Sequence, residues 1–203
     1  MPGDENSRLV LASASPRRAE ILRSLGIPFL VSPTDVPEEP RDGETAEAAA
    51  ARLAAEKAAR ASAREPGAWV LAADTLVFLE GEILGKPRDD ADAERMLARL
   101  AGREHGVVTA VRLTRDGAPG TGLAEVSRVR FAPMSTEEIR WYAATGEPRD
   151  KAGAYGVQGL GARFIEEIHG SFTNVMGLPA RGVYSLLRAS RDPALALLAL
   201  SCA

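Results

Sequence analysis

The sequence is poor in cysteine and histidine. Among its 203 residues there is one cysteine, Cys202, and there are two histidines, His105 and His169. A lone cysteine cannot form a disulfide within the chain, which is typical of proteins from a reducing cytoplasm. Two histidines are too few for a histidine-rich metal site, so we expect carboxylates to hold any metal ion.

The chain also lacks an excess of positive charge, long apolar runs and the pattern of a secretory leader. Its formal net charge is −3, and aromatic residues make up only 5% of it. Without basic patches interleaved with aromatic side chains, we expect no nucleic-acid partner. No apolar run approaches the roughly 18 residues of a membrane span, and the first residues are neither basic nor apolar enough for a signal peptide. We therefore expect a cytoplasmic protein that does not associate with membranes.

The residues that are present are typical of a folded α/β protein. Hydrophobic residues make up 45% of the chain and charged residues 26%, as in ordinary globular proteins. Predicted strands and helices are interleaved, and hairpins among the strands exclude a purely parallel sheet, so we expect a mixed β-sheet flanked by helices. The predicted strands cover residues 9–12, 29–32, 69–73, 76–79, 83–84, 107–114, 123–131 and 164–168, and the predicted helices follow residues 15, 45, 90, 135 and 179.

The turn after the first predicted strand carries an unusual pair of basic residues. Ser15 stands where an N-cap belongs and Pro16 at the first helical position, so a helix is expected to begin here and to end at Gly26. Arg17 and Arg18 then occupy the second and third helical positions. The helix dipole disfavours a cation there by roughly 0.3–1 kcal/mol.

These two arginines therefore need a negative partner or must lie in solvent. Combined with the hydroxyls of Ser13 and Ser15 and with the free backbone N–H groups of the helix, they predict a phosphate-binding site. The alternative is that both arginines are merely solvated, and for either arginine alone that interpretation is favoured.

The next predicted helix is rich in alanine and carries Lys57. Thr45 can cap it, and it is expected to end before Pro66. Lys57 falls on the same stripe as Leu53, which places a lysine on the apolar face. Such a lysine either extends past the apolar surface into solvent or meets an anion, and position alone favours the first.

Asp74 and Thr75 follow a compact apolar run, residues 69–73, and are expected at the end of a buried strand. A carboxylate at a strand end can ligate a metal or accept a proton from water. The alternative is that Asp74 is only a turn residue that ends the strand.

Three further segments are candidates for the same site. Glu38 lies in an acidic loop that contains proline, which is either solvated surface or brings a carboxylate to a cation. Lys86 lies in Gly-Lys-Pro, which is not a P-loop because proline stands where serine or threonine is needed. Gln158 lies in a glycine-rich stretch, residues 146–161, whose backbone can approach a ligand closely but has little local reason to be ordered.

Taken together, these segments resemble the Maf family of nucleoside triphosphate pyrophosphatases. The resemblance runs in order from about Leu9 to Leu187, so we expect one domain over residues 1–203, with a core at about 8–188 and tails at 1–7 and 189–203. No single motif is specific, but several in register are. The matching motifs are Ser-Ala-Ser-Pro-Arg-Arg at 13–18, Glu-Lys-Ala at 56–58, Ala-Asp-Thr at 73–75, Gly-Lys-Pro at 85–87, Lys-Ala-Gly-Ala-Tyr-Gly-Val-Gln-Gly at 151–159 and Gly-Ser-Phe-Thr-Asn-Val-Met-Gly-Leu-Pro at 170–179.

The resemblance implies a fold, a reaction and an assembly. The implied fold, similar to that of inosine triphosphatase, is an elongated mixed sheet flanked by helices with a cleft between two lobes. The implied reaction is hydrolysis of a nucleoside triphosphate to the monophosphate and pyrophosphate with a divalent cation, Mg²⁺ or Mn²⁺, and the implied assembly is a homodimer. The segment around Gln158 resembles the branch that acts on dTTP and UTP. The alternatives are a pyrophosphatase for modified nucleotides such as 7-methyl-GTP and a nucleotide-binding regulator of septum formation.

The resemblance also implies roles for individual residues. Asp74 matches the catalytic acid or base, and Arg17, Thr75 and Gln158 match positions that are linked to substrate choice. Glu38, Lys57 and Lys86 match positions that are less tightly bounded in the family and that are tied to the metal and the phosphates. Glu38 and Asp74 are the expected metal ligands. A glutamine amide offers one donor and one acceptor, which suits the N3 donor and carbonyl acceptors of uracil and thymine.

Overall fold

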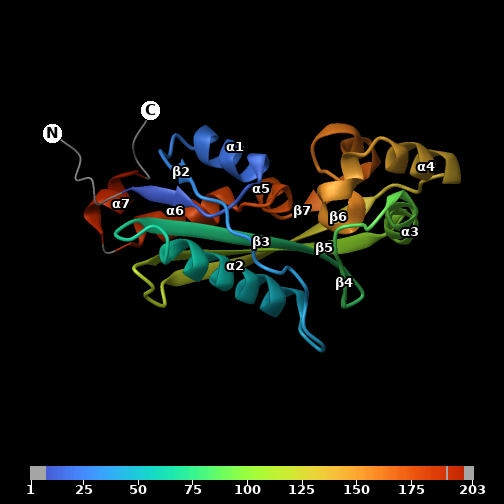
Figure 1. The fold of residues 1–203 in the computed structure, drawn as a ribbon. Helices are drawn as coiled ribbons and strands as arrows, with labels where there is room; N and C mark the ends of the chain where they lie inside the picture. The colour runs from blue at the N-terminus through green and yellow to red at the C-terminus, as the bar shows by residue number, and fades with distance from the viewer. Residues whose placement is uncertain (1–7, 191, 199–203) are drawn as a thin grey trace.

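A seven-stranded mixed β-sheet runs the length of an elongated molecule (Figure 1), and the computed structural model describes residues 8–190 and 192–198 of the chain. The strands are β1 (Leu9–Leu11), β2 (Leu30–Val31), β3 (Trp69–Leu79), β4 (Glu82–Leu84), β5 (Glu104–Arg115), β6 (Thr121–Phe131) and β7 (Ile165–His169). Their order is β2-β1-β3-β5-β6-β7, and β4 pairs with β3. β1 is parallel to β2 and β3, whereas the other pairs are antiparallel. The predicted mixed sheet is confirmed.

Helices cover both faces of this sheet. α2 (Ala46–Ser62) lies alone on one face, and the others lie on the opposite face (Figure 1). None of the helices in the described ranges is long and apolar enough to span a membrane. The remaining α-helices are α1 (Pro16–Ser24), α3 (Asp90–Leu100), α4 (Thr136–Ala144), α5 (Phe172–Met176), α6 (Ala180–Arg188) and α7 (Pro193–Leu198), and three 3₁₀ helices are η1 (Glu147–Asp150), η2 (Ala152–Ala154) and η3 (Gly159–Phe164).

The helices begin where their capping residues predict. Ser15 Oγ accepts a hydrogen bond from the backbone N–H of Arg18 at 3.5 Å, and Thr45 Oγ1 accepts one from Ala48 at 3.2 Å. At α4, Ser135 and Glu138 form a reciprocal capping box. Local side-chain chemistry therefore determines these three helix starts.

The face of the sheet opposite α2 carries two hydrophobic cores. Alternate residues of β3 point to this face: Leu71 and Ala73 belong to one core, and Val77 and Leu79 belong to the other. Thr75 lies between them, and its hydroxyl is 2.9 Å from that of Thr109, its partner on β5. A polar row therefore separates the two lobes of the molecule.

On the other face, the alanines of α2 pack against β1, β3 and β5 in two apolar clusters. Ala58 and Ala61 pack near Val70 and Ala72, and other alanines of the helix pack near Leu76. Asp74 points to this face, between the clusters, where it meets Lys57 of α2.

Asp74 is not at a strand end, so that prediction was wrong. β3 continues to Leu79 because its antiparallel ladder with β5 runs unbroken from Trp69 to Phe78. The strand that ends near Asp74 is β1, the neighbour of β3 on the edge opposite β5. β1 pairs only as far as Leu71, and β4 begins to pair at Val77. The gap between them leaves Asp74 and Thr75 open on that edge.

The C-terminal segment expected as a tail contains ordered structure. Leu195 of α7 is buried within the first core, and the indole Nε1 of Trp69 donates a hydrogen bond to Asp192 Oδ2 at 2.8 Å. The predicted tail at 1–7 and the single cysteine, Cys202, lie outside the described residues.

Candidate active site

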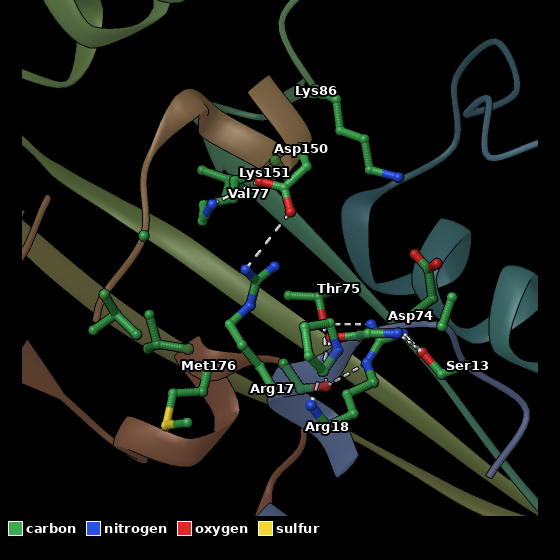
Figure 2. A pocket seen from close by; sticks show the side chains of 18 of the residues that line it. Ser13, Arg17, Arg18, Asp74, Thr75, Val77, Lys86, Asp150, Lys151 and Met176 are labelled. Atoms are coloured by element: carbon green, nitrogen blue, oxygen red, sulfur yellow. Dashed lines mark hydrogen bonds and ion pairs between the residues drawn. The ribbon is translucent and has the colours of Figure 1, made fainter. Parts of the chain in front are cut away.

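A cavity of about 580 Å³ opens at the gap in the edge of β3. Its lining comes from both faces of the sheet and from both lobes (Figure 2). Every residue that the sequence predicted for the site lines this cavity: Ser13, Ser15, Arg17, Arg18, Glu38, Lys57, Asp74, Thr75, Lys86 and Gln158.

Arg18 links the start of α1 to the sheet and to the loop after α5. Its Nε donates to the carbonyl oxygen of Gly177 at 2.8 Å, Nη1 donates to Ser13 Oγ at 3.0 Å, and Nη2 donates to Thr75 Oγ1 at 3.1 Å. Burial lowers the pKa of Arg18, while Asp74 and Glu38 oppose that shift. The interpretation that both arginines are merely solvated was therefore wrong for Arg18.

Arg17 has a different environment from its neighbour. Its Nη1 lies 3.9 Å from Asp150 Oδ2, across the cleft in the other lobe (Figure 2). The Asp150 side chain is 68% exposed, and an exposed ion pair of this length is weak. Arg17 can therefore turn to an anionic ligand at little cost, whereas Arg18 is held by the protein.

Lys57 lies between two carboxylates. Its Nζ donates to Glu38 Oε1 and to Asp74 Oδ1, each at 2.5 Å, and only 6% of its side chain is exposed. The interpretation from helix position alone, that Lys57 reaches solvent, was wrong, because β3 places an anion directly beneath α2. The small alanine side chains on this face of α2 let the helix lie close enough for the contact.

The two carboxylates around Lys57 have pKa shifts in opposite directions. Burial raises the pKa of Asp74, and the charges of Lys57 and Arg18 only partly offset it. Burial also opposes ionisation of Glu38, but hydrogen bonds from Lys57 and Lys86 outweigh it and lower the pKa of Glu38 to about 2. The site therefore contains one carboxylate, Glu38, that is charged near neutral pH and one, Asp74, that takes up a proton more readily.

Sequence reasoning did not select Asp150, Lys151 or Glu147, which also line the cavity. Lys151 Nζ donates to the carbonyl oxygen of Glu147 and to Asp150 Oδ1, each at 2.6 Å. The available signal was a group of charged residues in the first part of the glycine-rich stretch. It was missed because such groups are usually solvated.

Glu38 and Asp74 are the carboxylates that could share a metal ion in the cavity. The described part of the chain has no group of three or more histidine, cysteine, aspartate and glutamate residues close enough to enclose one. Two carboxylates nevertheless suit a hard divalent cation whose other ligands are phosphate oxygens and water.

The arrangement as a whole is suited to a polyanion. Arg17, Lys57 and Lys86 approach the cavity from three separate segments, and the buried carboxylate of Asp74 lies among them. Converging cations neutralise phosphate charge, and a buried carboxylate can activate water.

Comparisons with known proteins show what the chain is similar to. The family model described as "Maf-like protein" matches residues 8–190. A protein of Symbiobacterium thermophilum named dTTP/UTP pyrophosphatase is 51% identical over 89% of this chain and 92% of its own length. One of Myxococcus xanthus with the same name is 50% identical over 93% of this chain and 95% of its own length. A solved HAM1 protein from Coxiella burnetii superimposes with a TM-score of 0.49 at 19% identity, over 95% of this chain and 96% of that one.

Proposed function

This chain belongs to the Maf family, and we propose that it hydrolyses dTTP and UTP to the monophosphate and pyrophosphate. The observation that carries the proposal is the convergence of Arg17, Lys57 and Lys86 on one cavity beside the buried carboxylate of Asp74. The relatives that are about half identical to it and named dTTP/UTP pyrophosphatase support the choice of substrate.

The cations would bind the triphosphate. The guanidinium of Arg17 can leave Asp150 to form paired hydrogen bonds with phosphate oxygens. Lys86, whose side chain is 54% exposed, would meet the outer phosphates, whereas Lys57, at 6% exposed, lies deeper in the cavity. Neutralising the phosphates lowers the charge barrier to attack and stabilises pyrophosphate as the leaving group.

Asp74 would accept the proton from the attacking water. The water oxygen bonds to the α-phosphorus, the bond from that phosphorus to the α–β bridging oxygen breaks, and pyrophosphate leaves with the electron pair. A carboxylate whose pKa burial has raised is a better proton acceptor than an exposed one.

Glu38 and Asp74 would hold a divalent cation, Mg²⁺ or Mn²⁺. The fit rests on their all-oxygen donor set and on the cation, Lys57 Nζ, that both carboxylates already contact. Such an ion, when bound, neutralises charge on the phosphate oxygens. Asp74 would then need one oxygen for the metal ion and the other for the proton from water, so the two roles compete for its two oxygens.

Gln158 would read the base. It lines the cavity on the side of the second lobe, from a loop that is separate from the phosphate-binding segments. Its amide can donate to a carbonyl oxygen and accept from N3–H of uracil or thymine, and cytosine does not offer the same pattern. The homodimer implied by the family resemblance and the cytoplasmic location expected from the sequence are proposals for this chain as well.

The test is pyrophosphate release from dTTP, UTP, CTP and 7-methyl-GTP, with and without Mg²⁺ or Mn²⁺. We expect turnover of dTTP and UTP that requires the metal, and we expect Asp74→Asn to lose turnover by about 10²–10⁴-fold while it still binds nucleotide. A preference for 7-methyl-GTP would indicate a pyrophosphatase for modified nucleotides instead. Binding without turnover by the wild-type protein would indicate a regulator, and full activity of Asp74→Asn would remove Asp74 from the mechanism.

A further inference from the structure

The loop that carries Gln158 is ordered by a carboxylate from outside the loop rather than by its own sequence. Residues 156–161 include three glycines, Gly156, Gly159 and Gly161, and therefore have high conformational freedom in the unfolded chain. In the structure the segment folds into the start of η3, and Gly161 is buried. Contacts from outside the loop must therefore stabilise this conformation.

Glu147, at the start of η1, provides most of these contacts. Its Oε2 accepts from the backbone N–H of Leu160 at 2.9 Å, and its Oε1 accepts from that of Gly161 at 3.0 Å. Oε1 also accepts from the hydroxyl of Tyr142, on α4, at 2.8 Å. Burial disfavours the charged carboxylate, but these three donors outweigh it and lower the pKa of Glu147.

Tyr142 completes the arrangement on the other side of Gln158. Its side chain is fully buried, and its hydroxyl accepts from the backbone N–H of Gly156 at 3.1 Å. The loop is thus held before Gln158 by Tyr142 and after it by Glu147. We call these two side chains the Glu147–Tyr142 brace.

The glycines allow the loop to approach the brace closely. A Cβ at Gly159 would lie 2.7 Å from Glu147 Oε2, and a Cβ at Gly161 would lie 2.5 Å from the hydroxyl oxygen of Tyr142. Gly159 also has a φ of +81°, which larger residues rarely adopt. The glycine-rich composition of the loop is therefore explained by its packing on the brace.

We propose that Glu147 and Tyr142 are positioning residues that hold Gln158 in register with the base and so determine the selectivity for uracil and thymine nucleotides. The inference rests on the proposed function, in which Gln158 reads the base. No hydrogen bond between described residues involves the Gln158 amide, so the position of this side chain follows from its backbone. A small displacement of that backbone would spoil the match of donor and acceptor with the base.

The experiment compares Glu147→Gln and Tyr142→Phe with two matched controls, Glu137→Gln on the exposed face of α4 and Tyr184→Phe on α6. kcat and KM are measured for dTTP, UTP and dATP. We expect the two brace variants to raise KM for dTTP and UTP by about tenfold and to leave dATP within about twofold, since they weaken hydrogen bonds that fix the loop. The controls should match the wild type.

A second variant tests whether the effect passes through Gln158. In a Gln158→Ala background, Glu147→Gln should change the ratio of dTTP to dATP kcat/KM by less than about twofold, because the group that the brace positions is already absent. Amide hydrogen exchange at Leu160 and Gly161 should be faster in Glu147→Gln than in the wild type and unchanged in Glu137→Gln.

Two results would overturn the inference. One is wild-type selectivity and wild-type amide exchange in both brace variants. The other is an equal loss of kcat/KM on all three nucleotides, which would show a merely structural role. Failure of the proposed function is recognised separately, because the wild-type enzyme would then show no preference for dTTP and UTP. The exchange measurement would still report whether Glu147 orders the loop.

Discussion

The ammonium group of Lys57 lies 2.5 Å from Oδ1 of Asp74, and both side chains are buried, with 6% and 5% of their surface exposed. A buried ion pair of this kind adds little net stability over apolar packing, because both charges lose their hydration. Removing one partner is costly, since the other charge is then left buried and unpaired. The pair is therefore better explained by what it does to Asp74 than by its contribution to the fold.

Lys57→Met should move the acid limb of the activity profile to higher pH. Lys57 lowers the pKa of Asp74 through its charge and its hydrogen bond, so its removal raises that pKa further. If Asp74 must be ionised to accept a proton, activity will be lost at a higher pH as the solution is acidified. We expect a shift of about one pH unit or more in the kcat profile, together with a lower plateau.

Lys86→Met is the control for this measurement. Lys86 pairs with Glu38, so its removal should raise KM for the nucleotide and leave the acid limb in place. An unshifted limb in Lys57→Met would contradict the assignment of Asp74 as the proton acceptor.

Much of the fold could be predicted because local chemistry determines it. Ser15 with Pro16, Thr45, and Ser135 with Glu138 each cap a helix where they stand. The Glu-Gly turn at 80–81 joins β3 and β4 between the predicted strands 76–79 and 83–84, with both residues at positive φ. Such signals lie within a few residues of the feature that they specify, so sequence alone is enough.

The parts of the site that were predicted wrongly depend on contacts between distant segments. Asp74 was expected at a strand end, but β5 extends the strand past it, and the opening at Asp74 comes from the end of β1 instead. Position on its helix alone favoured solvent for Lys57, because its anionic partner lies on another element, and only the family resemblance placed it in the site. Glu147 was overlooked for the same reason, since its role depends on amides 13 and 14 residues away.

The two adjacent arginines should have different roles, with Arg17 binding the ligand and Arg18 stabilising the fold. Arg18→Ala removes three hydrogen bonds, one each to Ser13, to Thr75 of β3 and to Gly177, so we expect Tm to fall by roughly 5–10 °C. Arg17→Ala removes only a long contact to Asp150, so Tm should stay within about 2 °C while KM for the nucleotide rises by about tenfold.

Thermal unfolding and steady-state kinetics on both variants check this division. A large fall in Tm for Arg17→Ala with little change for Arg18→Ala would show that the division is reversed. Unchanged KM in Arg17→Ala would mean that the triphosphate is bound by other cations of the cavity.

Gln158→Glu should selectively lose activity toward uridine and thymidine nucleotides. The substitution keeps the size of the side chain, replaces the amide donor with a charged oxygen and places that oxygen against a carbonyl of the base. We expect kcat/KM for dTTP and UTP to fall by about 10²-fold with purine nucleotides little affected, because a buried polar group of the base is then left without its partner. Unchanged relative activity across the nucleotide panel would show that the base is read elsewhere.

His105 should make the stability of the fold depend on pH in a defined window. Its ring is buried between Phe131 and Tyr155, and Nε2 lies 2.8 Å from the hydroxyl oxygen of Tyr155. Burial lowers the pKa of His105 from 6.5 to about 4, so the unfolded chain binds a proton there at a higher pH than the folded protein does. The contribution of neutral His105 to the free energy of unfolding is therefore fully present above about pH 6.5, and it is lost as the pH falls toward about 4.

The size of this loss follows from the shift in the pKa of His105. A lowering from 6.5 to about 4 corresponds to about 3 kcal/mol in the free energy of unfolding. His105→Gln cannot take up this proton, so the stability difference between the wild type and the variant should shrink by that amount between about pH 7 and pH 4. Urea unfolding at several pH values measures it, and taking the difference cancels the acidic groups that titrate in both proteins. Parallel stability curves for the two proteins would show that His105 is not buried in its neutral form.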